Sequence, residues 1–346
     1  MTTLPPARIE SAEQLEELLS DPPDWLVDRM RQMEGDIIIL GAAGKMGPTL
    51  TRMAKRASDQ ACTPRRIIAV SRFSAPDEKE KLEACGIETI RCDLLDRSAV
   101  KRLPDAPNVV YMAGKKFGST GAEAFTWAMN THVPAIVGER YRASRIAVFS
   151  TGNVYGLSSV ATGGSQETDP VNPVGEYAMS CVGRERIFEH MSRTHGTPMT
   201  LIRLNYAVEM RYGILVDIGE RVWKGETIPL EMGYFNVIWQ GDANAMALAS
   251  LDYAGSPPHK LNVASREVLS VRKCAEEFGK IFERPAQLQG EEADNAILAS
   301  GVRCCTELGE PRVASAQLIQ WISHWIREEK PNLGKPTHFE NRRGDF

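Results

Sequence analysis

Residues 36–47 read DIIILGAAGKMG, and this stretch decides the fold. Its first five residues predict a buried strand, and the residues up to about Ser58 predict a helix. The glycines between them permit a tight turn and let a pyrophosphate approach the amides at the helix N-terminus. Pro48 suits the first helical turn, where its missing N–H would have no partner. The stretch predicts dinucleotide binding; the alternative is a tight turn without a ligand.

Short apolar runs alternate with amphipathic stretches over the next 160 or so residues. We expect strands at 36–40, 66–70, 87–92, 108–113, 145–150 and 199–204, and helices at 76–85, 121–140 and 175–195. Apolar strands without alternation, separated by helices, are typical of a parallel sheet covered on both faces. Beyond residue 205 the rhythm weakens, and helices are expected at 270–282 and 312–327. Residues 8–34 predict two short helices, capped by Ser11 and Asp24.

Composition narrows the class of protein. The chain has 346 residues, and its 41 Lys plus Arg against 45 Asp plus Glu give a net charge of −4. Such a chain lacks the basic field that a phosphate backbone needs, so we expect no nucleic-acid partner. No apolar run approaches the roughly 20 residues of a membrane span, and the N-terminus lacks the apolar centre of a signal peptide.

Cysteine and histidine patterns predict neither disulfides nor a metal site. The seven cysteines are scattered and odd in number, and the six histidines form no HExxH or similar pair. A reduced, cytoplasmic chain without a metal is therefore expected.

Further segments of residues 36–285 resemble, in the right order, the extended short-chain dehydrogenase/reductase family, the NAD-dependent epimerase/dehydratase group. The glycine spacing is GxxGxxG rather than GxGxxG. The other matching segments are CDL at 92–94, YMAG at 111–114, STGNVYG at 150–156, Tyr177, LNY at 204–206, NV at 262–263 and LSV at 269–271. The segment at 204–206 lacks the Gly-Pro that usually follows it in this family. The combination is far more specific than any one motif.

The resemblance implies a nicotinamide cofactor, NAD or NADP. The implied cofactor-binding residues are Gly41, Ala43, Gly44, Lys45, Met46, Gly47, Ser71, Arg72, Asp93, Leu94, Met112, Ala113, Gly114, Lys115 and Asn130. NAD enzymes usually place an acidic residue at the end of the second strand, where this chain has Ser71 followed by Arg72. A guanidinium could hold a 2′-phosphate, which slightly favours NADP. If Arg72 is only a solvated surface residue, NAD binds instead.

The family's chemistry uses a Tyr, a Ser or Thr, and a Lys four residues after the Tyr. The tyrosine exchanges a proton with a substrate hydroxyl, and the lysine lowers the tyrosine pKa. Thr151 and Tyr177 fit the first two roles, but Cys181 stands where the lysine belongs. A neutral thiol supplies no positive charge.

Three explanations for the missing lysine remain open. Another cation replaces it: Lys116 or Lys115, just after the fourth strand, or Arg184, two helical turns beyond Tyr177. Alternatively, a different acid or base acts, or the substrate is acidic enough to need no lysine. In the third, catalysis is lost or very slow, and the chain is a cofactor-binding regulatory or scaffold protein.

The expected fold is a Rossmann-type doubly wound α/β sheet, with residues 36–204 binding NAD(P). An N-terminal helical extension spans 1–35, a small substrate-binding region 205–330, partly interleaved with the sheet, and a polar tail 331–346. The expected activity is that of an oxidoreductase or epimerase/dehydratase on a sugar, sugar acid or sugar nucleotide, in a homodimer. Expected substrate contacts are Asn153, Asn205, Glu209 and Arg211.

Overall fold

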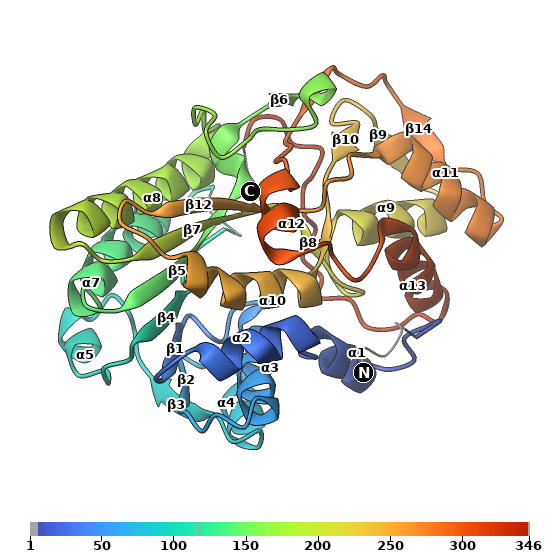
Figure 1. Cartoon of the computed structure of the whole chain (residues 1–346). Coiled ribbons are helices and arrows are strands. Elements are labelled where there is room, and N and C mark those ends of the chain that lie inside the picture. Colours follow the sequence, from blue (N-terminus) through green and yellow to red (C-terminus); the bar gives the residue numbers. More distant parts are fainter. Residues whose placement is uncertain (1–5, 117, 119, 345–346) are drawn as a thin grey trace.

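The computed structural model describes residues 6–116, 118 and 120–344, and it centres on a seven-stranded sheet. Figure 1 shows the sheet within one lobe and a smaller helical lobe beside it. The strand order is β12-β7-β5-β4-β1-β2-β3, and every pairing is parallel. In chain order the strands are β1 Ile37–Leu40, β2 Ile67–Ser71, β3 Glu88–Arg91, β4 Asn108–Tyr111, β5 Arg145–Thr151, β7 Met199–Leu204 and β12 His259–Val263. The doubly wound α/β prediction is confirmed.

Both faces of the sheet are buried over its central strands, as their unalternating apolar sequences require, whereas the edge strand β3 is partly exposed. Ile37 and Ile39 of β1 pack in one apolar core, whereas Ile38 and Leu40 pack in the other. The first face is covered by α2 Asp24–Gln32, α3 Gly47–Gln60, α4 Glu78–Glu83, α10 Gln240–Ala249 and α12 Val302–Leu308. The second is covered by α5 Arg97–Lys101, α7 Val133–Arg140 and α8 Gly175–His195. The strand order reverses at β1, so a crevice opens beyond the carboxyl ends of β1 and β4.

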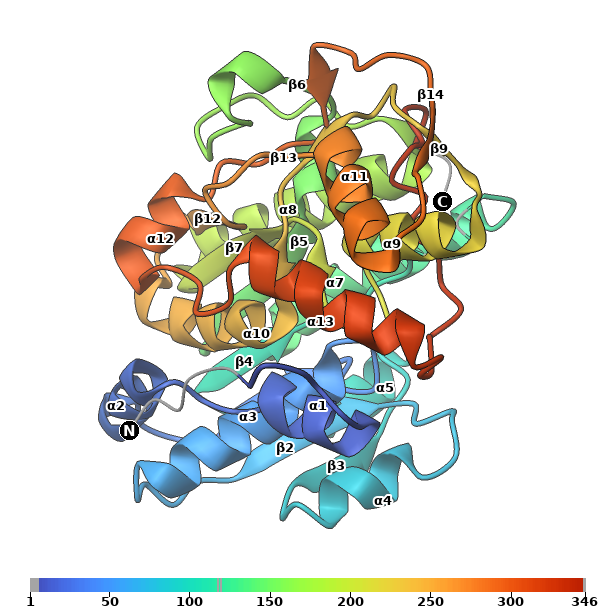
Figure 2. The ribbon, with the colours of Figure 1, turned by 90° about the vertical axis from the view of Figure 1, so that its right-hand side faces the viewer.

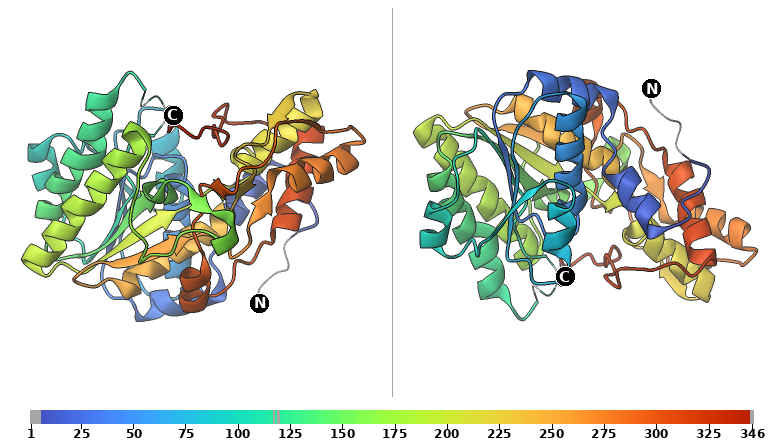
Figure 3. Two further views of the ribbon diagram at one scale, coloured as in Figure 1. Left: turned by 90° about the horizontal axis from the view of Figure 1, so that it is seen from above. Right: turned by 90° about the horizontal axis from the view of Figure 1, so that it is seen from below.

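A second apolar core builds the smaller lobe. It joins α1 Ala12–Leu19, α9 Ile214–Lys224, α11 Val271–Phe282 and α13 Ser315–Arg327. Trp239 and Trp321 meet edge to face within it, with ring centroids 5.5 Å apart. Figure 2 shows α13 lying across this lobe, and Figure 3 shows the two lobes side by side. The segment after β7 leads into this lobe, and it lines the part of the crevice that also holds Tyr177.

The N-terminal extension packs on both lobes of its own chain. Leu15 and Leu19 of α1 join the core of the smaller lobe, whereas Leu26 and Met30 of α2 join the sheet core. Ser11 caps α1 as predicted, because its hydroxyl accepts a hydrogen bond from the Gln14 amide at 3.2 Å. The extension therefore helps to fix one lobe against the other.

Three details of the sequence prediction are corrected. The helix expected at 121–140 is divided into α6 Glu123–Trp127, a π-helical turn at Ala128–His132 and α7. The helix α2 begins at Asp24, so that Pro23 rather than Asp24 takes the cap position. The seventh strand, β12, was not anticipated, because its sequence HKLNV contains too short an apolar run to predict a strand alone. It forms by pairing with β7.

Candidate functional site

The glycine turn closes tightly after β1. The amides of Gly41 and Ala42 both bond to the Val70 carbonyl, at 2.8 and 3.1 Å, which ties the turn to β2. Gly41 has φ +94°, and a Cβ there would lie 2.7 Å from the Ala113 amide nitrogen. A Cβ on Gly47 would lie 2.3 Å from the Ala42 carbonyl oxygen. The turn thus depends on glycine at both positions.

Two cavities meet at this turn. The first, the Arg72 cavity, has a volume of about 300 Å³ and lies beyond the ends of β1 to β4. Its lining includes these predicted cofactor-binding residues: Gly41, Ala43, Gly44, Ser71, Arg72, Asp93, Leu94, Met112, Ala113 and Gly114. Glu78, at the start of α4, also lines it, so that the carboxylates of Glu78 and Asp93 share the cavity with the Arg72 guanidinium.

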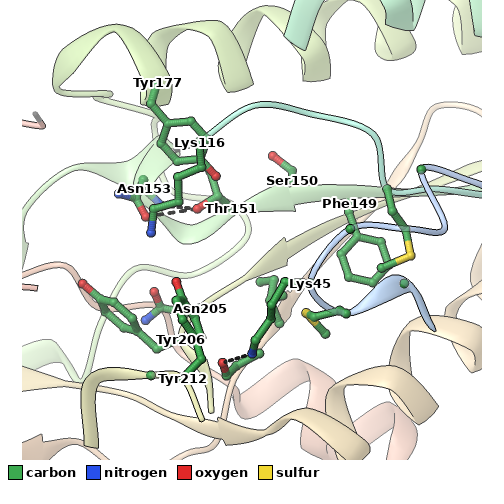
Figure 4. Close-up of a pocket in the computed structure, with 18 residues that line it drawn as sticks. Lys45, Lys116, Phe149, Ser150, Thr151, Asn153, Tyr177, Asn205, Tyr206 and Tyr212 are labelled. Carbon is green, nitrogen blue, oxygen red and sulfur yellow. Dashed lines mark hydrogen bonds between the residues drawn. The ribbon is translucent and has the colours of Figure 1, made fainter. Parts of the chain in front are cut away.

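The second, the Tyr177 cavity, has a volume of about 240 Å³ and shares Gly41, Gly44 and Met112 with the first. Its lining includes the predicted residues Lys45, Met46, Gly47, Lys116, Thr151, Asn153, Tyr177 and Asn205. Figure 4 shows Lys116 beside Tyr177 and Thr151 on one side, and Lys45 with Asn205, Tyr206 and Tyr212 on the other. The structure therefore gathers the predicted catalytic pair and several predicted ligand contacts around one space.

Tyr177 and Thr151 come from α8 and the end of β5. Burial raises the Tyr177 pKa strongly and Cys181 raises it further, while Arg184 and a hydrogen bond with Thr151 lower it. The Thr151 hydroxyl also donates to Asn153 Oδ1 at 3.0 Å. Tyr177 is therefore a weak acid here, and it needs positive charge nearby to act as a base at neutral pH.

Cys181 lies beneath this pair rather than in the cavity. It is completely buried and packs with Val154, Tyr155 and Ala299. Burial raises the pKa of its thiol, so the group is neutral at physiological pH. Its position argues against a nucleophilic role.

Two cationic side chains, those of Lys116 and Arg184, lie near Tyr177. The Lys116 ammonium lies 5.9 Å from the Tyr177 ring centroid, and burial lowers the Lys116 pKa to about 8. Arg184 is buried below the cavity, where it donates to the Phe149 carbonyl at 2.8 Å and to Asn130 Oδ1 at 2.6 Å. Lys116 is thus a cation in the cavity, and Arg184 a fixed cation behind it.

Asn130 and Lys115 lie elsewhere than expected. Asn130 is fully buried on the π-helical turn and braces residue 115: its Oδ1 accepts from the Lys115 amide at 2.8 Å, and its Nδ2 donates to the Lys115 carbonyl at 2.9 Å. The Lys115 ammonium lies over the Phe125 ring instead, at 5.2 Å. The brace fixes the backbone from which Lys116 enters the cavity.

Glu209 and Arg211 form an ion pair away from the lining of the Tyr177 cavity. Arg211 Nε lies 3.2 Å from Glu209 Oε2, and Arg211 Nη2 lies 2.7 Å from Glu16 Oε1 of α1. Glu209 is only 1% exposed. Through these ion pairs the two residues link the N-terminal extension to the smaller lobe, and their contact with a substrate stays a prediction.

The sequence reasoning missed three contributions to the cavities. Glu78 gave no signal, because it is one of several charged residues in the helix predicted at 76–85. Tyr206 was noted only as the last residue of the LNY segment at 204–206, and Tyr212 only as part of the region 205–330 expected to bind the substrate. Tyr206 has φ +40°, an uncommon conformation for a residue other than glycine and one often found at functional sites.

Within the described part of the chain, no group of three or more His, Cys, Asp or Glu side chains could hold a metal ion. Each helix in the described part of the chain is too short or too polar to cross a membrane.

Comparison with known proteins agrees with this architecture. Residues 37–208 match the family model described as NAD dependent epimerase/dehydratase family. No curated protein sequence matches the chain.

Several solved structures share the fold. UDP-glucose 4-epimerase of Thermus thermophilus, solved with NAD, is 18% identical, with a TM-score of 0.68 over 84% of this chain and 99% of its own. UDP-glucuronic acid 4-epimerase of Bacillus cereus, with UDP-glucuronic acid and NAD, is 15% identical, with a TM-score of 0.68 over 85% and 99%. A dTDP-glucose 4,6-dehydratase of Streptomyces venezuelae is 18% identical, with a TM-score of 0.70 over 86% and 97%. Residues 37–208 thus match the model of the NAD-dependent epimerase/dehydratase family, and the chain has a Rossmann-like fold that it shares with these epimerases and this dehydratase.

Proposed function

We propose that this chain is an atypical extended short-chain dehydrogenase/reductase, which moves a hydride between nicotinamide and a carbinol carbon of a small sugar-like substrate. The observation that carries the proposal is the single space lined by the glycine turn, Thr151, Tyr177 and Lys116. The family match at 37–208 and the NAD-bound structural neighbours support it.

The crevice fits a dinucleotide. Two adjoining cavities share Gly41 and Gly44, where side chains would crowd the turn, and α3 begins at Gly47 in the lining of the Tyr177 cavity, so that the positive end of the helix dipole faces the crevice. The Arg72 cavity suits the adenosine half and the Tyr177 cavity the nicotinamide half. When bound, the nicotinamide supplies a carbon that accepts or donates hydride.

Tyr177 would take the proton of the substrate hydroxyl in oxidation and return it in reduction. Thr151 would donate a hydrogen bond to the same oxygen and hold it against the phenol. Lys116 would stabilise the phenolate in place of the absent lysine, with Arg184 adding a fixed positive field from below. Asn153 and Asn205 would orient the rest of the substrate.

Cofactor preference is balanced between two side chains. Arg72 would attract a 2′-phosphate, whereas Glu78 in the same cavity would repel it and favour a free 2′-hydroxyl. We propose NAD as the working cofactor, because the solved neighbours hold NAD. The homodimer and the cytoplasmic location stay predictions; the exposed Phe125 and Trp127 on α6 and Met179 on α8 would suit a subunit interface.

The proposal is tested by releasing and identifying any nucleotide in the purified protein, then titrating it with NAD and NADP. Binding of either, followed by substrate-dependent absorbance at 340 nm or by interconversion of sugars with retained cofactor, is the expected result. Absence of binding to both would overturn the proposal and leave a protein that has the fold without its cofactor.

A further inference from the structure

Lys45 has an unusual place in the Tyr177 cavity. It belongs to the glycine turn, yet its side chain crosses to the segment after β7. Its ammonium donates to the Ala207 carbonyl at 3.3 Å and lies 4.3 Å from the Tyr212 ring centroid. Both of these partners are neutral, and neither belongs to the turn that would hold the pyrophosphate.

The cavity around Lys45 is cationic. Lys45 and Lys116 both line it, and none of the described lining residues is an aspartate or glutamate. The carboxylate that raises the Lys45 pKa is that of Glu209, which is already paired with Arg211. Two ammonium groups in a partly desolvated space without a lining carboxylate are unfavourable unless an anion joins them.

An unused donor lies on the same wall. Asn205 is 2% exposed and lines the cavity, and its side-chain Nδ2 has no hydrogen-bond partner among the residues that the structure describes. A buried amide without a partner costs free energy, which a ligand oxygen would recover. Figure 4 shows Asn205 and Lys45 on the side of the cavity opposite Tyr177 and Thr151.

We propose that the substrate of this enzyme carries a carboxylate, which Lys45 and the Asn205 amide bind while Tyr177 and Thr151 face its reacting hydroxyl. The inference rests on the proposed function, and it makes the substrate a sugar acid or related hydroxy acid. One ammonium and one amide match the two oxygens of a carboxylate. The opposed positions of the two pairs separate the anchoring group from the reacting carbon.

The Lys45 charge gives the binding a pH dependence. Burial lowers the Lys45 pKa to about 8; Arg211 and Lys116 lower it further, and Glu209 opposes them. A bound carboxylate stabilises the ammonium and so raises this pKa. Carboxylate affinity should therefore be full below about pH 8 and decline as the pH rises above it, because the free amine no longer attracts an anion.

The test measures ligand affinity by calorimetry with NAD present, on matched pairs: acetate against acetamide, D-glucuronate against D-glucose, and D-galacturonate against D-galactose. We expect at least one acid to bind about tenfold or more tightly than its neutral partner, since hydrogen bonds to charged groups contribute about 1.5–3 kcal/mol. K45Q should abolish the difference, and K55Q, which removes a lysine of α3 outside the cavity lining, should retain it.

Each other outcome counts against the inference. If no acid binds more tightly than its neutral partner, or if K45Q keeps the difference, the carboxylate site is wrong. If K45Q weakens NAD binding itself, Lys45 serves the cofactor phosphates instead. If the wild-type protein does not bind NAD, the proposed function is overturned. That failure is distinguishable, because it is measured by NAD titration without any of the acids or sugars.

Discussion

The two cavities differ in what builds them. The Arg72 cavity is formed largely by the backbone at strand ends, with glycines where side chains would clash. The Tyr177 cavity depends on a few side chains: Lys45 and Lys116 line it, whereas Cys181, four residues after Tyr177, is buried outside its lining. A cavity formed by the backbone tolerates sequence change, whereas the chemistry of a cavity formed by side chains changes when single residues change.

The largest expected effect in the Tyr177 cavity is that of Tyr177→Phe. Removing the phenolic hydroxyl removes the proposed proton donor and acceptor, and turnover should fall roughly 10²–10⁴-fold. NAD affinity should change little, because the ring remains. Activity retained within threefold or so, measured at saturating cofactor, would remove Tyr177 from the mechanism.

The next effect tests which cation serves Tyr177. Lys116→Met should lower turnover roughly 10- to 100-fold, the order expected for a charge about 6 Å away at an effective dielectric near 20. Because the Lys116 pKa is about 8, the ratio of wild-type to variant activity should shrink as the pH rises through 8. The ratio of Lys116→Arg activity to Lys116→Met activity should stay constant over the same pH range, since the guanidinium keeps its charge.

Lys115 is the matched control for this experiment. It is the neighbouring lysine, but its ammonium lies over Phe125 and not in the cavity lining. Lys115→Met should change turnover little. Equal losses in the Lys115 and Lys116 variants would point to the loop rather than to one charge.

A smaller effect is expected from the backbone that joins the two cavities. Gly47→Ala places a methyl 2.3 Å from the Ala42 carbonyl oxygen, whereas Gly44→Ala meets its nearest atom at 3.3 Å. Overpacking of this kind costs about 1–3 kcal/mol, so NAD affinity should fall roughly 10- to 100-fold in the first variant and less in the second. Fluorescence titration measures both, and equal affinities would show that the turn adapts.

The smallest effect concerns the choice between NAD and NADP. Arg72 is exposed, so its attraction for a 2′-phosphate is screened by solvent. Arg72→Ala should lower the preference for NADP over NAD by less than about tenfold, and Glu78→Gln should raise it by a similar amount. Titration of both cofactors at several salt concentrations measures the ratio. If neither substitution changes it, the two side chains do not contact the ribose.

The lining of the Arg72 cavity was largely predictable, since strand-end and glycine patterns are local. Ten of the fifteen predicted cofactor residues line the Arg72 cavity. Asn130 was placed correctly on a helix, but its amide braces residue 115, because a buried amide takes whichever backbone partners the fold supplies. Glu209 and Arg211 were expected at the substrate, yet α1 brings Glu16 to Arg211 from 195 residues away in sequence. Contacts of that separation leave no local signal.

The sequence by itself determined the parallel sheet, the glycine turn, the spacing of Thr151 and Tyr177 and the cysteine four residues after Tyr177, because periodicity, spacing and residue type can be read along the chain. Only the tertiary structure decided that Lys116 stands by Tyr177, that Arg184 lies behind it, and that Lys45 crosses to the segment after β7. The direction of a long side chain depends on the walls around it, and those walls come from strands and loops far apart in the sequence.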